Sequence, residues 1–118
     1  MNQSLNLLKI TNAVNEFRDQ RDWKQFHTVK NLSIAMSVEA SELLEIFQWA
    51  SEDELKSILK NKHNDISEEI ADVFIYLLLI ANESNVDIGT AVLKKIAKNE
   101  EKYPVEQSKS TSKKYTEL

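Results

Sequence analysis

Two pairs of acidic side chains are the residues of this chain whose types and spacing best suit chemistry. Glu39 and Glu42 form one pair, and Glu69 and Asp72 form the other, each with two residues between its members. Residues three positions apart lie on the same face of an α-helix, so each pair would present two carboxylates in one direction. Two helices that faced each other through these pairs would gather oxygen ligands suited to a divalent cation.

The positions of these pairs within their helices are unexpected for charged side chains. Glu69 and Asp72 lie in or beside the segment 70–81, which is apolar on nearly every side. On a helical wheel at about 100° per residue, the neighbours of Glu39 within about 40° are all apolar. These neighbours are Leu32, Ala35, Leu43, Ile46 and Ala50. Carboxylates that point toward packing surfaces must protonate or be compensated by a cation.

Two kinds of compensation are open to these carboxylates, basic side chains or a divalent metal ion. The helix dipole could also stabilise Glu69 in a first turn, but it does not help Glu39 and Glu42 in the middle of a helix. We therefore favour a metal ion. The ligands are oxygens only, with no Cys in the chain and no His three or four positions away. This donor set favours Mg²⁺, with Mn²⁺ as a substitute, over zinc, and it argues against a di-iron site.

The composition restricts the fold that can hold these residues. The 118 residues include one Gly and one Pro, which is too few for the turns of a β-sandwich or for a glycine-rich phosphate loop. With 42% hydrophobic residues, the chain is long enough for one globular domain. We expect an all-α fold, a bundle of four to five helices completed by homo-oligomerisation. One domain would cover residues 1–106, followed by a polar C-terminal tail over residues 107–118.

The hydrophobic periodicity places the acidic pairs on two of five helices. We expect helices at about 2–19, 31–50 and 65–83, with a short helix that opens with the capping box at 51–54 and ends near residue 60. A last helix, capped by Asp87, would cover about 88–102 and end before Pro104. Glu39 and Glu42 then lie on the second helix, and Glu69 and Asp72 on the fourth.

The charge is unevenly distributed along the chain. The net charge is −4, but residues 39–72 hold ten acidic and three basic side chains. An acidic centre with basic flanks suits cations in the middle and phosphates at the edge, and it argues against nucleic-acid binding. The longest apolar run, Val73 to Ala81, is too short to cross a membrane. The first five residues do not resemble a targeting signal, so we expect a cytoplasmic protein.

The acidic pairs also belong to longer sequence blocks that are familiar. The motif Glu39-x-x-Glu42, followed by Glu69-x-x-Asp72, resembles the signature of the MazG-like all-α nucleoside triphosphate pyrophosphohydrolases. The resemblance extends to three further blocks and is greatest for the dCTP pyrophosphatase branch. The matching blocks, in chain order, are residues 21–27, 39–49, 68–76, 95–104 and 114–118.

This resemblance implies an enzyme that hydrolyses a (deoxy)nucleoside triphosphate to monophosphate and pyrophosphate with Mg²⁺. A dCTP-like or modified pyrimidine nucleotide would be the substrate, and the enzyme would remove it from the nucleotide pool. Carried over from the family, Glu39, Glu42, Glu69 and Asp72 would hold the metal. Glu39 or Glu42 would also act in catalysis by orienting or deprotonating the attacking water.

The resemblance also implies which residues bind the substrate. Three aromatic side chains would frame the base, and three polar side chains on one helix face would lie near the triphosphate. These are Trp23, Trp49 and Tyr76 for the base, and Lys95, Asn99 and Lys102 for the phosphates. The sequence departs from close relatives at Glu83, where a basic residue can occur, so no phosphate contact is expected there.

Two alternatives to this activity stay open from the sequence. A helical dimerisation or regulatory module could keep the fold without the chemistry, and a dUTPase-like or phosphoribosyl-ATP enzyme of the same superfamily would carry the same acidic pairs. In either case, a helix that is apolar on all sides needs more cover than four short neighbours give. We therefore expect an even-numbered homo-oligomer, with a tetramer favoured over a dimer.

Overall fold

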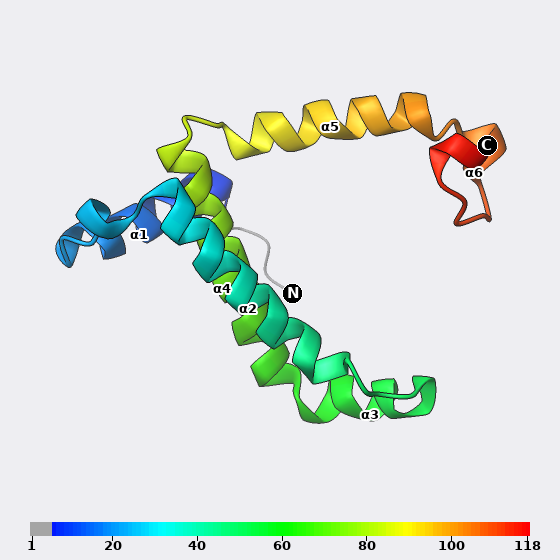
Figure 1. Cartoon of the computed structure of the whole chain (residues 1–118), viewed down its shortest axis with the longest axis horizontal. Coiled ribbons are helices and arrows are strands. Elements are labelled where there is room, and N and C mark those ends of the chain that lie inside the picture. Colours follow the sequence, from blue (N-terminus) through cyan, green and yellow to red (C-terminus); the bar gives the residue numbers. More distant parts are fainter. Residues whose placement is uncertain (1–5) are drawn as a thin grey trace. The chain divides into compact units, whose positions relative to one another are not determined.

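The computed structural model of this protein describes residues 6–118, and all of its regular elements in this range are helical (Figure 1). The expected all-α class is confirmed. The expectations for residues 1–5, the start of the first helix and the lack of a targeting signal, lie outside the described residues. The α-helices are α1 (Leu7–Gln20), α2 (Val29–Phe47), α3 (Glu52–Asn61), α4 (His63–Glu83), α5 (Ile88–Lys102) and α6 (Val105–Ser108), and the 3₁₀ helices are η1 (Lys24–Phe26) and η2 (Tyr115–Glu117).

The helices form two compact units. One contains α1 to α4 and ends at Asn85, and the other extends from Val86 to Leu118. The expected boundary between a domain and a tail at residue 106 stays a prediction. Within residues 6–118, no helix has both the length and the apolar character needed to cross a membrane.

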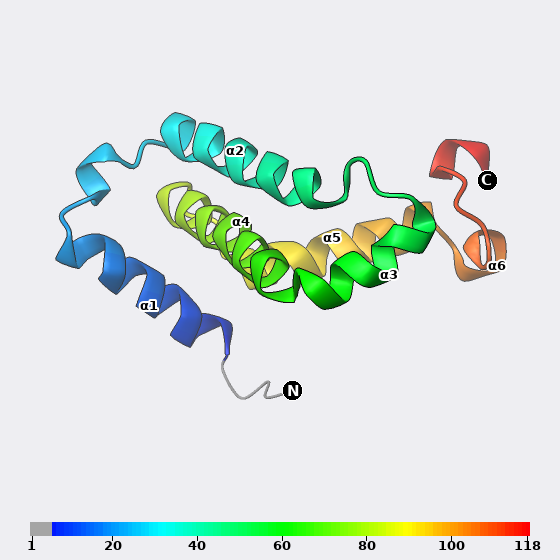
Figure 2. The same ribbon diagram turned by 90° about the horizontal axis from the view of Figure 1, so that it is seen from below.

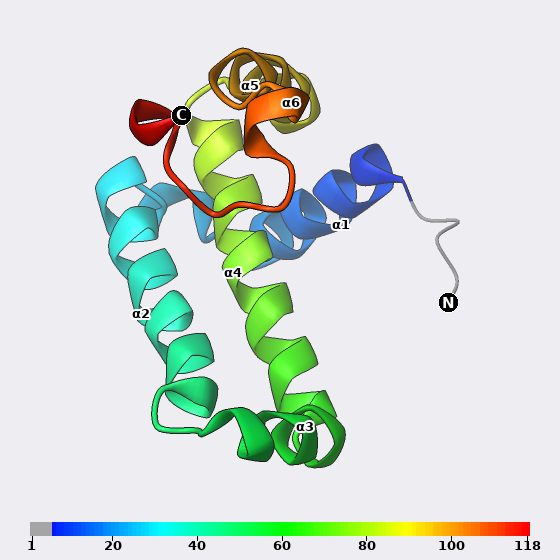
Figure 3. The same cartoon turned by 90° about the vertical axis from the view of Figure 1, so that its right-hand side faces the viewer.

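The centre of the first unit is the antiparallel pair of α2 and α4. The two helices lie side by side and are joined at one end by α3 (Figure 3). Leu32 of α2 and Leu78 of α4 are fully buried, and Leu79 and Ala81 of α4 are nearly so. Because the pair is antiparallel, the middle of α2 lies opposite the first half of α4. This arrangement brings the two acidic pairs of the sequence to one level of the bundle.

The helix starts are fixed by side chains that accept hydrogen bonds from free backbone N–H groups. Thr28 accepts from Asn31 N at 3.1 Å, so α2 begins at Val29 and not at the expected residue 31. Ser51 accepts from Glu54 N at 3.3 Å, as the capping box predicted. The expected turn over 61–64 is shorter in the structure, because α4 begins at His63.

The connector between α1 and α2 contains η1 and carries the chain across to the start of α2 (Figure 2). Its backbone is hydrogen-bonded to the end of α1 by Asp22 N, which donates to Asp19 O at 3.1 Å, and by Trp23 N, which donates to Arg18 O at 3.1 Å. The backbone of Asp22 is in the left-handed region at φ 54°, where Asp is one of the better tolerated residues. The turn at Asp22 therefore fixes the direction in which Trp23 leaves α1.

The outer face of α4 is left exposed by the other described helices of the first unit. Ile70, Phe74 and Leu77 recur at helical spacing and are exposed. Such a stripe on a helix that is apolar on nearly all sides is unusual for an isolated domain. The exposed stripe agrees with the sequence argument that this helix needs further cover.

The second unit consists of α5 and a C-terminal segment that folds back on the end of this helix. The rings of Tyr103 and Tyr115 meet edge to face with their centres 6.1 Å apart. Lys102 Nζ lies 4.9 Å from the centre of the Tyr115 ring, a cation–π geometry. The segment after Pro104 is thus partly helical and is held to α5 by Tyr115.

Candidate metal centre

Three carboxylates from α2 and α4 converge in the first unit. Glu39, Glu69 and Asp72 each place one oxygen within 4.8 Å of the oxygens of the other two. Glu69 and Asp72 lie one turn apart on α4, and Glu39 reaches them from the middle of α2. All three side chains are half-buried. The sequence predicted this convergence from the two motifs and the facing helices.

Two oxygens of the glutamates in this cluster have no hydrogen-bond partner among the described residues. Glu39 Oε2 and Glu69 Oε2 are buried, and no hydrogen-bond donor reaches them from the described part of the chain. None of Glu39, Glu42, Glu69 and Asp72 forms an ion pair with a basic side chain of residues 6–118. The basic side chains considered from the sequence therefore do not compensate the cluster in the structure.

The surroundings shift the titration of the two glutamates that carry these oxygens. Desolvation, together with the neighbouring Glu42 and Asp72 carboxylates, raises the pKa of Glu39 to about 7. Desolvation and the charge of Glu42 also raise the pKa of Glu69. Each group is thus held near other negative charge, and a cation would favour the ionised form of both.

Glu42 lies at the edge of the cluster and is exposed. With Glu45, Glu68 and Glu69 it lines a hollow of about 380 Å³ between α2 and the start of α4, where Lys62 is the basic neighbour. The expectation that all four carboxylates point toward packing surfaces is therefore not met within one chain for Glu42. Its proximity still allows it to join Glu39 and Glu69 around an ion.

The donor set fits a hard divalent cation. Mg²⁺ binds carboxylate oxygens at about 2.0–2.1 Å, so ligand atoms on opposite sides of the ion lie about 4 Å apart. Ligand atoms at right angles lie about 2.9 Å apart. The three oxygens lie within 4.8 Å of one another, so the side chains would move closer together around one ion. Glu39, Glu69 and Asp72, with Glu42 beside them, would hold such an ion and leave positions for water and a phosphate oxygen.

A largely apolar cavity of about 390 Å³ adjoins the cluster at Asp72. Trp23 and His27 of the connector line one side of it, and Ile75 and Tyr76 of α4 line the other. Its size is in the range of pockets for small organic ligands. The structure thus places Trp23 and Tyr76 in the lining of one cavity together with Asp72. Their part in binding a base stays a prediction.

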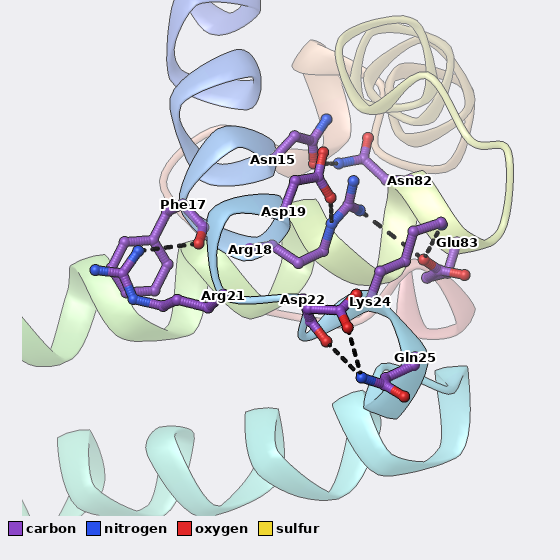
Figure 4. Close-up of polar contacts among 10 residues, drawn as sticks. All are labelled: Asn15, Phe17, Arg18, Asp19, Arg21, Asp22, Lys24, Gln25, Asn82 and Glu83. Carbon is purple, nitrogen blue, oxygen red and sulfur yellow. Dashed lines mark hydrogen bonds and ion pairs between the residues drawn. The ribbon is translucent and has the colours of Figure 1, made fainter.

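The Trp23 ring packs against α1, and the connector holds the turn before it. The Trp23 ring meets the Phe17 ring edge to face, with centres 5.7 Å apart. Gln25 Nε2 donates to both the backbone oxygen and the Oδ2 of Asp22 at 3.0 Å, and this fixes the turn before Trp23 (Figure 4). His27 has a buried Nδ1 without a partner among the described residues. The sequence pattern did not predict that His27 lines the cavity.

Sequence reasoning also missed a set of contacts at the far end of α4. Lys24 Nζ and Arg18 Nη1 lie 2.7 and 3.9 Å from the same oxygen of Glu83. Beside them, Asn82 Nδ2 donates to Asn15 Oδ1 at 2.7 Å (Figure 4). Only a buried position for Arg18 could have indicated this pairing, and the helical pattern does not single it out.

Four expected substrate residues lie elsewhere in the structure. Trp49 follows α2, is 86% exposed and does not line the cavity beside Asp72 in this chain. Lys95, Asn99 and Lys102 lie on α5 in the second unit and are exposed. Their part in substrate binding stays a prediction.

The chain is similar to proteins that have been described before. Residues 34–118 match the MazG-like family. Human dCTP pyrophosphatase 1 is 41% identical over 105 residues, which are 87% of this chain and 62% of that protein, and the mouse protein of the same name is 40% identical over the same lengths. The chain thus spans about three fifths of the curated relatives that it matches.

A solved structure is also similar to this one. The crystal structure of a pyrophosphatase from Archaeoglobus fulgidus DSM 4304 superimposes with a TM-score of 0.80 at 42% sequence identity. The match covers 88% of this chain and 97% of that one. At this identity the similarity extends beyond the fold to the sequence that builds it.

Proposed function

The chain belongs to the MazG-like family, and on that premise we propose that it is a nucleoside triphosphate pyrophosphohydrolase that depends on Mg²⁺. One observation carries the proposal most directly. Two buried glutamate oxygens, on Glu39 and Glu69, lack any partner among the described residues and converge with Asp72 beside a cavity. Carboxylates that are only structural would be paired or exposed to solvent.

The acidic cluster would bind the triphosphate end of the substrate. Glu39, Glu42, Glu69 and Asp72 would hold Mg²⁺, or Mn²⁺ in its place, and the ion would neutralise charge on the phosphates as a Lewis acid. Glu39, which lies within the cluster, would be one of two residues able to orient or deprotonate the attacking water. Glu42, exposed at the edge of the cluster, is the second residue able to orient that water.

The cavity beside Asp72 would bind the nucleoside end. Trp23 and Tyr76 provide aromatic faces on which a base can stack, and Ile75 provides an apolar wall. Because the curated relatives are named dCTP pyrophosphatase 1, we expect a cytosine nucleotide or a modified pyrimidine triphosphate as substrate. Removal of such nucleotides from the pool is the corresponding role. Trp49, Lys95, Asn99 and Lys102 would complete the contacts to the base and phosphates.

The proposal includes assembly with further copies of the chain. The exposed stripe on α4 and the exposed Trp49 side chain are apolar surfaces that a second copy would cover. We expect an even-numbered homo-oligomer, with a tetramer favoured over a dimer. Light scattering at micromolar concentration measures the mass directly, and a value of 13.6 kDa, that of one chain, would contradict this expectation.

The activity is tested with a panel of nucleoside triphosphates. The purified chain, with Mg²⁺, is incubated with dCTP, 5-methyl-dCTP, dUTP, dTTP and ATP, and released pyrophosphate is converted to phosphate by an added inorganic pyrophosphatase. A colour signal that needs the added enzyme identifies cleavage between the α- and β-phosphates. If no triphosphate is cleaved with either Mg²⁺ or Mn²⁺, the chain is instead a helical binding module, whereas a preference for dUTP would place it in the dUTPase-like group.

A further inference from the structure

Three polar contacts join α1 and the connector to the last turn of α4, and we call this set the Glu83 clasp. It consists of the Lys24–Glu83 ion pair at 2.7 Å, the Arg18–Glu83 pair at 3.9 Å and the hydrogen bond between Asn82 and Asn15 at 2.7 Å. Figure 4 shows both basic side chains pointing toward the same carboxylate, one from α1 and one from the connector. Glu83 is therefore the shared acceptor of the clasp.

The clasp is partly removed from solvent. The side chain of Arg18 is 9% exposed and that of Glu83 is 22% exposed, while Lys24 closes the pair from the solvent side at 60%. A nearly buried guanidinium needs a carboxylate partner, because burial of an unpaired charge is costly. Asp19 supplies a second one through a hydrogen bond from Arg18 Nε at 2.8 Å. The Arg18 side chain is thus held in one direction by two carboxylates.

Apolar packing of α1 is limited. Ile10 and Val14 are half-buried, Leu8 and Phe17 are exposed, and Arg18 is the one buried residue of this helix. α1 packs against α4 much less extensively than α2 does. The polar contacts of the clasp therefore add to a limited apolar contact in holding α1 and the connector on α4.

The position of the connector in turn sets the width of the cavity beside Asp72. Trp23 and His27 belong to the connector, whereas Asp72 and Tyr76 belong to α4, so the two walls come from separately docked segments. Lys24 directly follows Trp23 in the chain, and Arg18 itself lines the cavity. The clasp is thus a direct link between the two walls on the side away from the metal ligands.

We propose that Glu83 is a positioning residue for substrate binding: through Lys24 and Arg18 it holds the Trp23 wall at the distance from Tyr76 that the base requires. This inference rests on the function proposed above. Glu83 would not touch the substrate, since it is not among the residues that line the cavity. It acts on affinity for the nucleoside, while the acidic cluster acts on the phosphates.

Two substitutions remove the clasp from its two sides. Glu83→Gln keeps the shape and removes the charge, and Lys24→Met removes the shorter ion pair at an exposed position. Each is expected to raise KM for the triphosphate that the wild type cleaves fastest by roughly tenfold, since small displacements of positioning groups have effects of this size or larger. The turnover number should stay within about twofold, because the transition-state contacts at the phosphates are unchanged.

Matched controls separate positioning from a general loss of structure. Lys24→Arg keeps the ion pair and should restore the wild-type KM, and Glu16→Gln changes an exposed glutamate of α1 without effect. The Mg²⁺ concentration for half-maximal rate at saturating substrate should be unchanged in every variant. Circular dichroism establishes that the variants are folded, and Lys24→Met carries the test if Glu83→Gln does not fold.

Distinct outcomes would overturn the inference. A folded Lys24→Met protein with the wild-type KM would show that the clasp does not position the cavity. A fall in turnover number and in Mg²⁺ response, in step with the rise in KM, would show a purely structural role. Both results presuppose an active wild type. A wild-type protein inactive on every triphosphate would instead refute the proposed function, and this inference with it.

Discussion

The half-buried acidic side chains at the two ends of α4 differ in whether basic side chains pair with them. In the first half of the helix, Glu69 and Asp72 converge with Glu39, and no basic side chain of residues 6–118 pairs with them. At the last turn, Glu83 receives Lys24 at 2.7 Å and has Arg18 at 3.9 Å. The same residue type on one helix is left unneutralised at one end and neutralised twice at the other.

The difference indicates which carboxylates serve binding and which serve packing. The positive charges of Lys24 and Arg18 neutralise Glu83, so this carboxylate needs no further ligand. The cluster at Glu39 and Glu69 keeps two buried oxygens without donors and is destabilised by its own negative charge. Such an arrangement persists where an external cation supplies the missing charge. Substitutions at the two ends should therefore have opposite effects on stability, and the larger loss of activity should come from the acidic cluster.

The largest expected effect comes from Asp72→Asn in the unneutralised cluster. Loss of a ligand should reduce pyrophosphate release by at least about a hundredfold, since even outer partners of metal ligands have effects approaching this size. The melting temperature of the metal-free protein should not fall, because one of the mutually repelling charges is removed. Steady-state assays and thermal unfolding with EDTA measure the two quantities. Activity at the wild-type level in a folded variant would remove Asp72 from the site.

Metal addition should distinguish the two ends next. With free Mg²⁺ at about one hundred times its dissociation constant, the folded state gains about 2.7 kcal/mol by mass action. Thermal unfolding of the wild type should show this as a rise in melting temperature. Glu83→Gln should keep the shift and Asp72→Asn should lose it. An equal shift in all three proteins would place the ion away from the acidic cluster.

The stability of the metal-free protein should depend on pH through Glu39. Its pKa is raised to about 7 from an ordinary value of 4.5, so the folded state binds this proton more tightly than the unfolded state. The resulting stabilisation is fully present below the unfolded value and is lost as the pH rises through 7. Melting temperatures between pH 5 and pH 8 in EDTA should fall with pH, and the slope should decrease in Glu39→Gln. An unchanged slope would mean that other groups cause the dependence.

The smallest expected effect is on the neutralised end. Glu83→Gln should lower the stability of the metal-free protein by about 1 kcal/mol, since the pair with Lys24 is largely exposed. The sign is opposite to that expected for substitutions in the acidic cluster. Chemical denaturation at pH 7 measures it, with Glu16→Gln as the reference for loss of an exposed acidic charge. A more stable Glu83→Gln protein would mean that the clasp does not favour the folded state.

The sequence predicted one end of α4 much better than the other. The acidic cluster could be predicted because its members are three residues apart within each helix and the two helices face each other. The caps at Ser51 and Asp87 depend on residues three positions ahead, and both form as expected. Local spacing was therefore enough to predict both the candidate metal ligands and most helix boundaries.

The clasp could not be predicted because its partners are far apart in the chain. Asn15 and Asn82 are 67 residues apart, and Lys24 and Glu83 are 59 apart. No helical period connects such positions, and their pairing depends on how the connector docks on α4. The exposure of Trp49 could not be predicted for a similar reason. It depends on what packs against the end of α2, and not on the position of the residue on the helical wheel.

α4 also sets the distance between the acidic cluster and the Glu83 clasp. Asp72 and Glu83 are eleven positions apart, a length of about 16.5 Å at 1.5 Å per residue. Because the rise per residue in a helix is constant, the number of residues between the acidic cluster and the clasp determines the distance between them. One residue inserted between these two positions would rotate Glu83 by about 100° away from Arg18 and Lys24. Insertions or deletions between Asp72 and Glu83 should therefore be tolerated far less well than substitutions of the side chains between them.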